Sequence, residues 1–279
     1  MARIAWATDI HLDFLNEESV IKFAEGVRKQ NVNGLILTGD ISVTQGLVLH
    51  LSMLERVLQV PIWFVLGNHD YYGGYTEGVR QQMTELTNMS GFLKYLPTTP
   101  YVNLTRDTVL VGHDGWYDAL YGDAANSRFI MADWKKIGDF VDAGALQEGG
   151  WSSGMPVISN IIPKARELAH EGVQHVHDGI KAAMRYKPKN VIVATHFPPF
   201  KEAHLHEGKL GDDHAQPWYT SKMMGDMLLS ASRTFPDVQF MVLAGHTHGK
   251  FSGNITENLI CHVGHSDYGR PALADVFEI

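Results

Sequence analysis

The sequence predicts an α/β protein, and two observations carry this prediction. Short apolar segments of strand length alternate with longer segments whose apolar residues recur at helical spacing. The apolar segments are nearly continuous, as in parallel strands that are buried on both faces. With 279 residues, of which 44% are hydrophobic and 19% charged, the chain is long enough for one large domain with a sizeable core.

Three strand–helix units are expected in the first ninety residues. The strands are predicted over residues 3–8, 34–38 and 61–66, and the helices over residues 17–30, 47–58 and 76–89. Asn16 precedes the first helix, where its side-chain oxygen can accept a hydrogen bond from a free backbone N–H group, so it is the expected N-cap. This alternation is typical of βαβ units.

The later half of the chain continues the pattern after an irregular stretch. Further strands are predicted over residues 108–112, 190–195, 238–244, 258–263 and 271–279, and helices over residues 161–185 and 221–232. Residues 114–154 are rich in Gly, Asp, Trp and Tyr and have no clean period. We interpret residues 114–188 as a cap or insertion over the site, within a single domain that comprises residues 1–279.

Composition excludes several classes of protein. The net charge of −8 argues against a broad nucleic-acid surface, so no stable nucleic-acid binding is expected. The single cysteine, Cys261, cannot form an intrachain disulfide and fits a reducing compartment. The apolar runs are too short for a targeting segment or a membrane span. We therefore expect a cytoplasmic protein without membrane association, and an oligomer is compatible with the sequence.

Residues that can bind metal follow five of the predicted strands directly. These are Asp9-Ile10-His11, Gly39-Asp40, Gly67-Asn68-His69-Asp70, Thr195-His196 and Gly245-His246-Thr247-His248. Because sites in open α/β sheets form at the carboxyl ends of strands, we expect these five segments to converge. Oxygen and nitrogen ligands without a thiolate suit Mn, Fe, Zn or related ions. The set exceeds four ligands, which favours two ions about 4 Å apart.

The local spacing supports the same interpretation. In an extended chain residues i and i+2 point to the same side, so Asp9 and His11 can face one region, and so can His246 and His248. A glycine precedes the key side chains in three of the five segments, and we expect it to give the backbone freedom for a sharp exit from the strand. These glycines are Gly39, Gly67 and Gly245.

With all five motifs intact and in this order, the chain resembles the calcineurin-like metallophosphoesterase superfamily over most of its length. The resemblance implies a four-layer αββα sandwich of two mixed β-sheets and a dinuclear centre of Mn, Fe, Zn or Ni in an undetermined combination. It assigns Asp9, His11, Asp40 and His248 to one metal ion. It assigns Asp40 (bridging), Asn68, His196 and His246 to the other, and it makes His69 the catalytic histidine.

The activity that the resemblance implies is hydrolysis of a phosphomonoester or phosphodiester of a small molecule or nucleotide. Two cations lower the pKa of a bridging water, and the resulting hydroxide attacks phosphorus. His69 would protonate the leaving oxygen or stabilise the transition state, and the sequence does not choose between these roles. Asp70 would orient His69, as carboxylates do for functional imidazoles.

Two branches of the superfamily fit the sequence poorly. Protein phosphatases and dinucleoside tetraphosphatases carry Asp-Arg-Gly shortly after the second-strand Gly-Asp, whereas this chain continues from Asp40 as Ile-Ser-Val-Thr-Gln-Gly. Protein phosphatases also have Glu at the position of Asp70. The family's nucleases usually add long DNA-handling extensions, which this compact acidic chain lacks. A noncatalytic scaffold remains the alternative, although such chains generally lose ligands and every position is filled here.

Weaker substrate contacts are expected outside the five motifs. The polar stretch 201–216 contains His204, His206 and His214, which can contact the substrate together with Asn68. Arg128 can bind a phosphate group bidentately. Aromatic residues in the 114–188 region can stack on a base, although packing is the favoured role; these are Trp116, Tyr117, Tyr121 and Trp134. For His113, a packing or supporting role is favoured over a ligand role.

Overall fold

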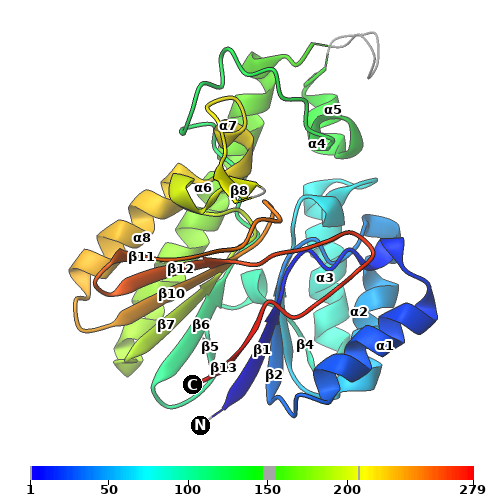
Figure 1. Ribbon diagram of the computed structural model, residues 1–279, viewed down its shortest axis with the longest axis vertical. Coiled ribbons are helices and arrows are strands. Elements are labelled where there is room, and N and C mark those ends of the chain that lie inside the picture. Colours follow the sequence, from blue (N-terminus) through cyan, green and yellow to red (C-terminus); the bar gives the residue numbers. More distant parts are fainter. Residues whose placement is uncertain (1, 147–154, 207) are drawn as a thin grey trace.

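Two mixed β-sheets lie face to face in the computed structural model, which describes residues 2–146, 155–206 and 208–279 (Figure 1). The first sheet has the strand order β13 (Asp275–Glu278), β1 (Arg3–Ala7), β2 (Gly34–Thr38), β3 (Ile62–Val65) and β4 (Leu93–Tyr95). The second has the order β11 (Phe251–Thr256), β12 (Leu259–Val263), β10 (Gln239–Ala244), β7 (Asn190–Ala194), β6 (Thr108–Gly112) and β5 (Val102–Asn103).

Parallel pairing dominates the centre of both sheets. Strands β1, β2, β3 and β4 run parallel, and so do β6, β7, β10 and β12. The strands at three of the four sheet edges, β13, β11 and β5, are antiparallel to their neighbours. Both sheets are therefore mixed, as the sequence resemblance implied.

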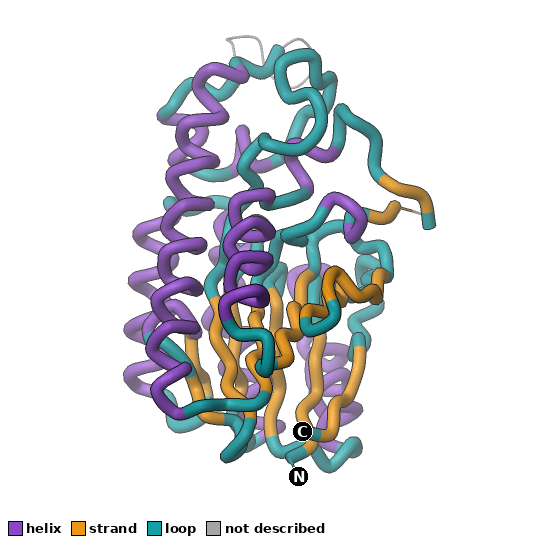
Figure 2. The backbone as a smooth tube through the Cα atoms, turned by 90° about the vertical axis from the view of Figure 1, so that its left-hand side faces the viewer, coloured by secondary structure: helices purple, strands orange, loops and turns teal. Residues whose placement is uncertain are grey.

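Helices cover the outer face of each sheet. α1 (Glu17–Arg28), α2 (Thr44–Leu58) and α3 (Thr76–Met89) flank the first sheet, and α6 (Ile158–Ala183) and α8 (Lys222–Thr234) flank the second (Figures 1 and 2). The predicted four-layer αββα arrangement is confirmed. Asn16 is the N-cap of α1, because its Oδ1 atom accepts the Ser19 N–H at 2.9 Å. Among the described residues, no helix is long and apolar enough to cross a membrane.

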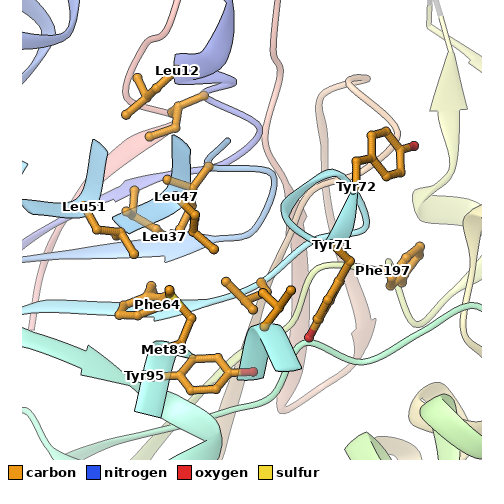
Figure 3. Packing of buried hydrophobic residues seen from close by; sticks show 14 of the residues in the cluster. Leu12, Leu37, Leu47, Leu51, Phe64, Tyr71, Tyr72, Met83, Tyr95 and Phe197 are labelled. Atoms are coloured by element: carbon orange, nitrogen blue, oxygen red, sulfur yellow. The ribbon is translucent and has the colours of Figure 1, made fainter. Parts of the chain in front are cut away.

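Alternating side chains of each strand enter two different cores. Trp6, Ile36 and Val65 of the first sheet pack against Leu110, Ile192 and Leu243 of the second, which forms the core between the sheets. Their neighbours along the strands, such as Leu37 and Phe64, face the helices (Figure 3). Because both faces are buried, the strands are apolar without interruption, which explains the runs in the sequence.

Most of the predicted elements are present within a few residues of their expected bounds, but several strands were missed. These are β4, β5, β11 and the hairpin of β8 (Leu205–His206) and β9 (Lys209–Leu210). β4, β5, β8 and β9 have two or three residues each, which is too short to produce a periodic pattern, whereas β11 has six and was missed despite its length. The final strand is shorter than expected, since pairing with β1 involves only residues 275–278.

A further layer of structure lies above the carboxyl ends of the strands (Figure 1). It includes α4 (Asp133–Lys136), α5 (Gly138–Asp142) and α7 (Gln216–Tyr219), which the sequence pattern did not predict. Trp116, Tyr117 and Trp134 are buried there. The favoured packing role is thus confirmed for these three aromatic residues, whereas Tyr121 is half-buried. Residues 147–154 of the predicted cap lie outside the described residues.

Helix α6 connects this upper layer to the second sheet. Its first half packs Ile161, Ala165 and Leu168 into the same cluster as the buried upper aromatic residues. Its second half packs Val176 and Ile180 onto the second sheet. A helix of 26 residues is about 39 Å long, which is enough to span both regions.

A buried carboxylate anchors the loop that follows β3. Asp114 accepts hydrogen bonds from the Leu66 N–H at 2.7 Å and from the Tyr71 and Tyr95 hydroxyls, each at 2.6 Å. Arg80 donates to it at 3.2 Å and also pairs with Glu171 at 2.7 Å. Burial by itself would raise the pKa of Asp114, but neighbouring His113 and Arg80 and these hydrogen bonds lower it, so the carboxylate is charged.

We expect Asp114→Ala to lower the free energy of unfolding by about 3–5 kcal/mol, because it leaves a buried N–H group without its acceptor and removes the buried partner of the largely buried Arg80 guanidinium. Urea unfolding followed by circular dichroism measures the change. The matched control is Glu171→Gln, which removes the half-exposed partner of the same arginine and should cost at most about 1 kcal/mol. Similar losses in both variants would contradict the proposed anchoring.

Buried His113 makes stability depend on pH. Burial lowers its pKa from 6.5 to about 3, so below pH 6.5 the unfolded chain binds a proton that folded His113 does not. The free energy of unfolding should therefore decrease as the pH falls from 6.5 towards 3. His113→Asn keeps an acceptor for the Gly115 N–H and should show a slope shallower by up to about 1.4 kcal/mol per pH unit. Parallel slopes would refute this assignment.

Candidate metal centre

The five predicted segments converge at one edge of the molecule. Strands β1, β2 and β3 of the first sheet and β7 and β10 of the second end there, and each is followed by its polar segment. The centre consequently lies between the two sheets, below the upper layer seen in Figure 1. This position agrees with the general placement of sites at the carboxyl ends of parallel strands.

Two groups of ligand atoms form at this edge, and they share one residue. Asp9, His11, Asp40 and His248 each offer an atom within 4.8 Å of the others. Asp40, His196 and His246 do the same. The grouping corresponds to the two sets that the resemblance assigned, with Asp40 common to both. Most of these residues are buried, whereas the His248 side chain is 22% exposed.

Asn68 completes the second group. Its Oδ1 atom lies 3.1 Å from His196 Nε2, and its Nδ2 group donates to Asp133 Oδ1 at 2.8 Å. The Tyr72 hydroxyl donates to the same carboxylate oxygen at 2.8 Å. Asp133 thereby turns the amide oxygen of Asn68 towards the other ligands. Sequence reasoning missed Asp133, because an isolated aspartate in a stretch without a clean period carries no signal.

Two of the histidines are oriented by a hydrogen bond from the ring nitrogen that does not face the other candidate ligands. His196 Nδ1 donates to the Thr38 carbonyl at 2.8 Å, which leaves Nε2 free to accept. His246 Nε2 donates to the Trp218 carbonyl at 3.2 Å, which leaves Nδ1 free. Metal-binding histidines use their second N–H group in this way to set the tautomer and the ring orientation.

The backbone of the centre adopts a conformation that is rare for residues with side chains. Asp9, His11, Asp40, His246 and His248 all have φ between 40° and 69°. The predicted extended geometry for the two i, i+2 pairs is therefore wrong, because each pair converges through two left-handed residues. Such strain costs about 1–3 kcal/mol per residue and gathers at functional sites.

The three glycines that precede candidate ligands are required for two different reasons. Gly39 has a φ of 88°, so it supplies the expected backbone freedom. Gly67 and Gly245 do not have positive φ angles; a Cβ atom on either would collide with a neighbouring carboxylate, that of Asp40 or Asp9. For Gly67 and Gly245 the expected reason, freedom of the backbone, was therefore incomplete. Glycine is needed there because a carboxylate lies too close to the backbone to leave room for a side chain.

The chemistry of the donor atoms fits a cation. His11 Nε2 lies 3.2 Å from His248 Nε2, and His196 Nε2 lies 3.3 Å from Asp40 Oδ1. His11 Nδ1 is buried and has no hydrogen-bond partner among the described residues. Burial, and after it the nearby carboxylates of Asp9 and Asp70, raise the pKa of Asp40 well above its usual range. A divalent ion would relieve this crowding of lone pairs and negative charge.

His69 lies at the open side of the centre. Its Nε2 atom is 3.9 Å from Asp40 Oδ2, and its side chain is 20% exposed. The ring packs between Tyr72 and His11, at centroid distances of 4.4 and 4.7 Å. Burial, reinforced by the neighbouring histidines, lowers the pKa of His69 to about 2, so its imidazole is neutral at pH 7.

The expectation that Asp70 orients His69 is corrected by the structure. Asp70 Oδ1 accepts the backbone N–H groups of Ile41 and Ser42, and Oδ2 accepts that of Gly67. The side chain thus binds the loop after β2 to the loop after β3. Both oxygens accept backbone donors, and among the described residues no hydrogen bond joins Asp70 to His69, so Asp70 positions the loop that contains His69 and does not hold its ring.

The residues predicted to make weaker substrate contacts differ in how buried they are and in how near they lie to the centre. His204 is buried and stacks on Tyr219 at 4.7 Å, and Tyr219 in turn contacts His246 at 4.8 Å. One ring therefore separates His204 from the second ligand group. His206 and Arg128 are exposed, and His214 is half-buried. His113 packs against His175, in line with its favoured supporting role.

Comparison with known proteins gives a consistent family assignment. The model of the calcineurin-like phosphoesterase family matches residues 2–250. No curated protein sequence matches the chain. The fold resembles that of phosphopantetheinyl hydrolase from Mycobacterium tuberculosis, with a TM-score of 0.63, 13% identity, and coverage of 95% of this chain and 89% of that one.

A dimetal phosphatase from Danio rerio has a similar fold, with a TM-score of 0.55 and 13% identity. That comparison covers 95% of this chain and 87% of the other. Because both identities are low, these two structures support the fold alone.

We expect added Mn²⁺ to raise the melting temperature of the chelator-treated protein by about 5–10 °C at a hundredfold excess over Kd. Asp40→Asn should abolish this rise, because Asp40 belongs to both ligand groups. Differential scanning fluorimetry with and without EDTA measures the shift. The exposed Asp237→Asn is the control and should respond like the wild type. A full Mn²⁺ response in Asp40→Asn would refute the ligand assignment.

Proposed function

The chain belongs to the calcineurin-like phosphoesterase family and is a metal-dependent phosphoric ester hydrolase, and we propose that it uses two metal ions to hydrolyse a phosphomonoester or phosphodiester of a small molecule or nucleotide. The observation that carries this proposal is the pair of ligand groups joined at Asp40. One carboxylate shared between two sets of ligands is the arrangement that a pair of adjacent cations requires.

We assign the ligands accordingly. Asp9, His11, Asp40 and His248 would hold one ion, and Asp40, Asn68, His196 and His246 the other. When bound, such ions supply Lewis acidity that activates water and offsets charge on the phosphoryl oxygens. Mn, Fe, Zn and Ni all suit these oxygen and nitrogen donors.

His69 is proposed to act on the leaving group. It is partly exposed beside the ligand groups, so it can contact a substrate without binding a metal ion. Its lowered pKa favours the neutral imidazole, which can donate an N–H hydrogen bond to the leaving oxygen as negative charge develops there. Of the two roles that the sequence left open, this supports transition-state stabilisation over proton donation from an imidazolium ion.

Residues 114–188 are proposed to form a cap within a single domain. Asp133, from this region, hydrogen-bonds to Asn68, and Trp116, also from this region, packs against Phe197 at 5.2 Å. These contacts would join the cap to the centre. The alternative of a noncatalytic scaffold is disfavoured, because every ligand position and His69 are filled.

We expect His69→Ala to lower kcat by about 10²–10⁴ while the protein keeps its metal ions, since His69 would act on the leaving oxygen only. Asp40→Ala should lose both the metal ions and the turnover. Hydrolysis of p-nitrophenyl phosphate and bis(p-nitrophenyl) phosphate, with elemental analysis of each variant, tests both statements. His170→Ala, an exposed helix position, is the control.

Normal turnover in His69→Ala would remove His69 from the mechanism. The assay also compares the monoester with the diester. Absence of turnover by the wild type with added Mn, Fe, Zn or Ni, together with absence of bound metal, would favour the scaffold alternative.

A further inference from the structure

Two large aromatic side chains are exposed beside the candidate metal centre. Phe14 is 57% exposed and Tyr268 is 51% exposed, and their ring centroids are 5.0 Å apart. The Tyr268 ring also lies 4.5 Å from that of His11 and 5.0 Å from that of His248. A pair of exposed aromatic rings in mutual contact is a common feature of binding sites, since it leaves apolar area in water.

The backbone of the centre itself holds Tyr268 in place. Tyr268 belongs to the segment between β12 and β13, red in Figure 1, which crosses the carboxyl ends of the strands. In this segment the Ser266 hydroxyl donates to the Asp9 carbonyl at 2.5 Å, and His265 Nδ1 donates to the His248 carbonyl at 2.8 Å. Its position is therefore set by two of the proposed ligand residues.

The aromatic pair lies on the same side of the centre as His69. The His69 ring is 4.7 Å from that of His11 and 6.3 Å from that of Tyr268. Because His69 would act on the leaving oxygen, the body of the leaving group has to extend on this side.

We propose that Phe14 and Tyr268 bind a flat ring carried by the leaving group. The preferred substrates are then phosphoesters of alcohols that carry an aromatic or heteroaromatic ring, nucleosides included. This inference rests on the proposed function. Aromatic faces favour offset or edge-to-face contact with another ring, which an aliphatic leaving group cannot provide. Such stacking tolerates different rings, because each presents a π-face.

The test compares two esters whose leaving oxygens are both alkoxides, benzyl phosphate and ethyl phosphate, in the Mn²⁺-loaded protein. Tyr268→Leu keeps an apolar cover over His11 but removes the flat ring. We expect its kcat/KM to fall about tenfold for benzyl phosphate and to stay within about twofold for ethyl phosphate. Phe14→Leu should show the same selectivity with a smaller fall.

Two controls separate the ring from other effects. Tyr268→Phe keeps the ring and should retain the wild-type ratio of the two esters. Tyr186→Leu removes a tyrosine that is 64% exposed after the carboxyl end of α6, and it should change neither ester. Calorimetric binding of benzylphosphonate and ethylphosphonate gives the same comparison without turnover.

A fall of equal size for both esters in Tyr268→Leu would overturn the inference, because Tyr268 would then support the metal centre and not the leaving group. An unchanged benzyl-to-ethyl ratio would overturn it as well. Absence of turnover by the wild type on p-nitrophenyl phosphate and on bis(p-nitrophenyl) phosphate would instead reject the proposed function, and this inference with it.

Discussion

The buried carboxylate of Asp40 is the constraint on which the rest of the centre depends. It lies within both groups of candidate ligands and accepts the backbone N–H of His69 at 2.9 Å. Burying a charge beside the carboxylates of Asp9 and Asp70 is unfavourable unless a cation or several donors offset it. Left-handed backbone at five candidate ligand positions indicates that the fold tolerates strain to keep these donors together.

Hydrogen bonds from two buried carboxylates hold the strained loops around the centre in place. Asp70 binds the loop after β2 to the loop after β3 through three backbone N–H groups. Asp114 holds the Leu66 N–H from the other side, and its own carbonyl accepts the His196 N–H at 3.1 Å. Both carboxylates are buried and neither belongs to a ligand group, so their contribution is to place the loops that carry the ligands.

The layer above the strands gives the centre its chemical surroundings. Asp133 from this layer orients Asn68, and the Tyr219 ring separates His204 from His246. The segment with Tyr268 donates hydrogen bonds to the carbonyls of Asp9 and His248. Under the proposed function, the same centre could serve different phosphoesters when these surrounding segments change, because the proposed metal ligands directly follow the sheet strands whereas the proposed substrate contacts lie in more distant loops.

The sequence alone determined the α/β class, nearly all the buried strands and the candidate ligands, because continuous apolar runs and polar residues directly after them are local features. It could not determine how Asp9 and His11 converge, since both have a left-handed backbone, which residues other than glycine rarely adopt. It also left Asp133, the loop-binding role of Asp70 and the aromatic pair Phe14 and Tyr268 undetected. Those relations join residues that are distant in the chain, and only the tertiary structure brings them into contact.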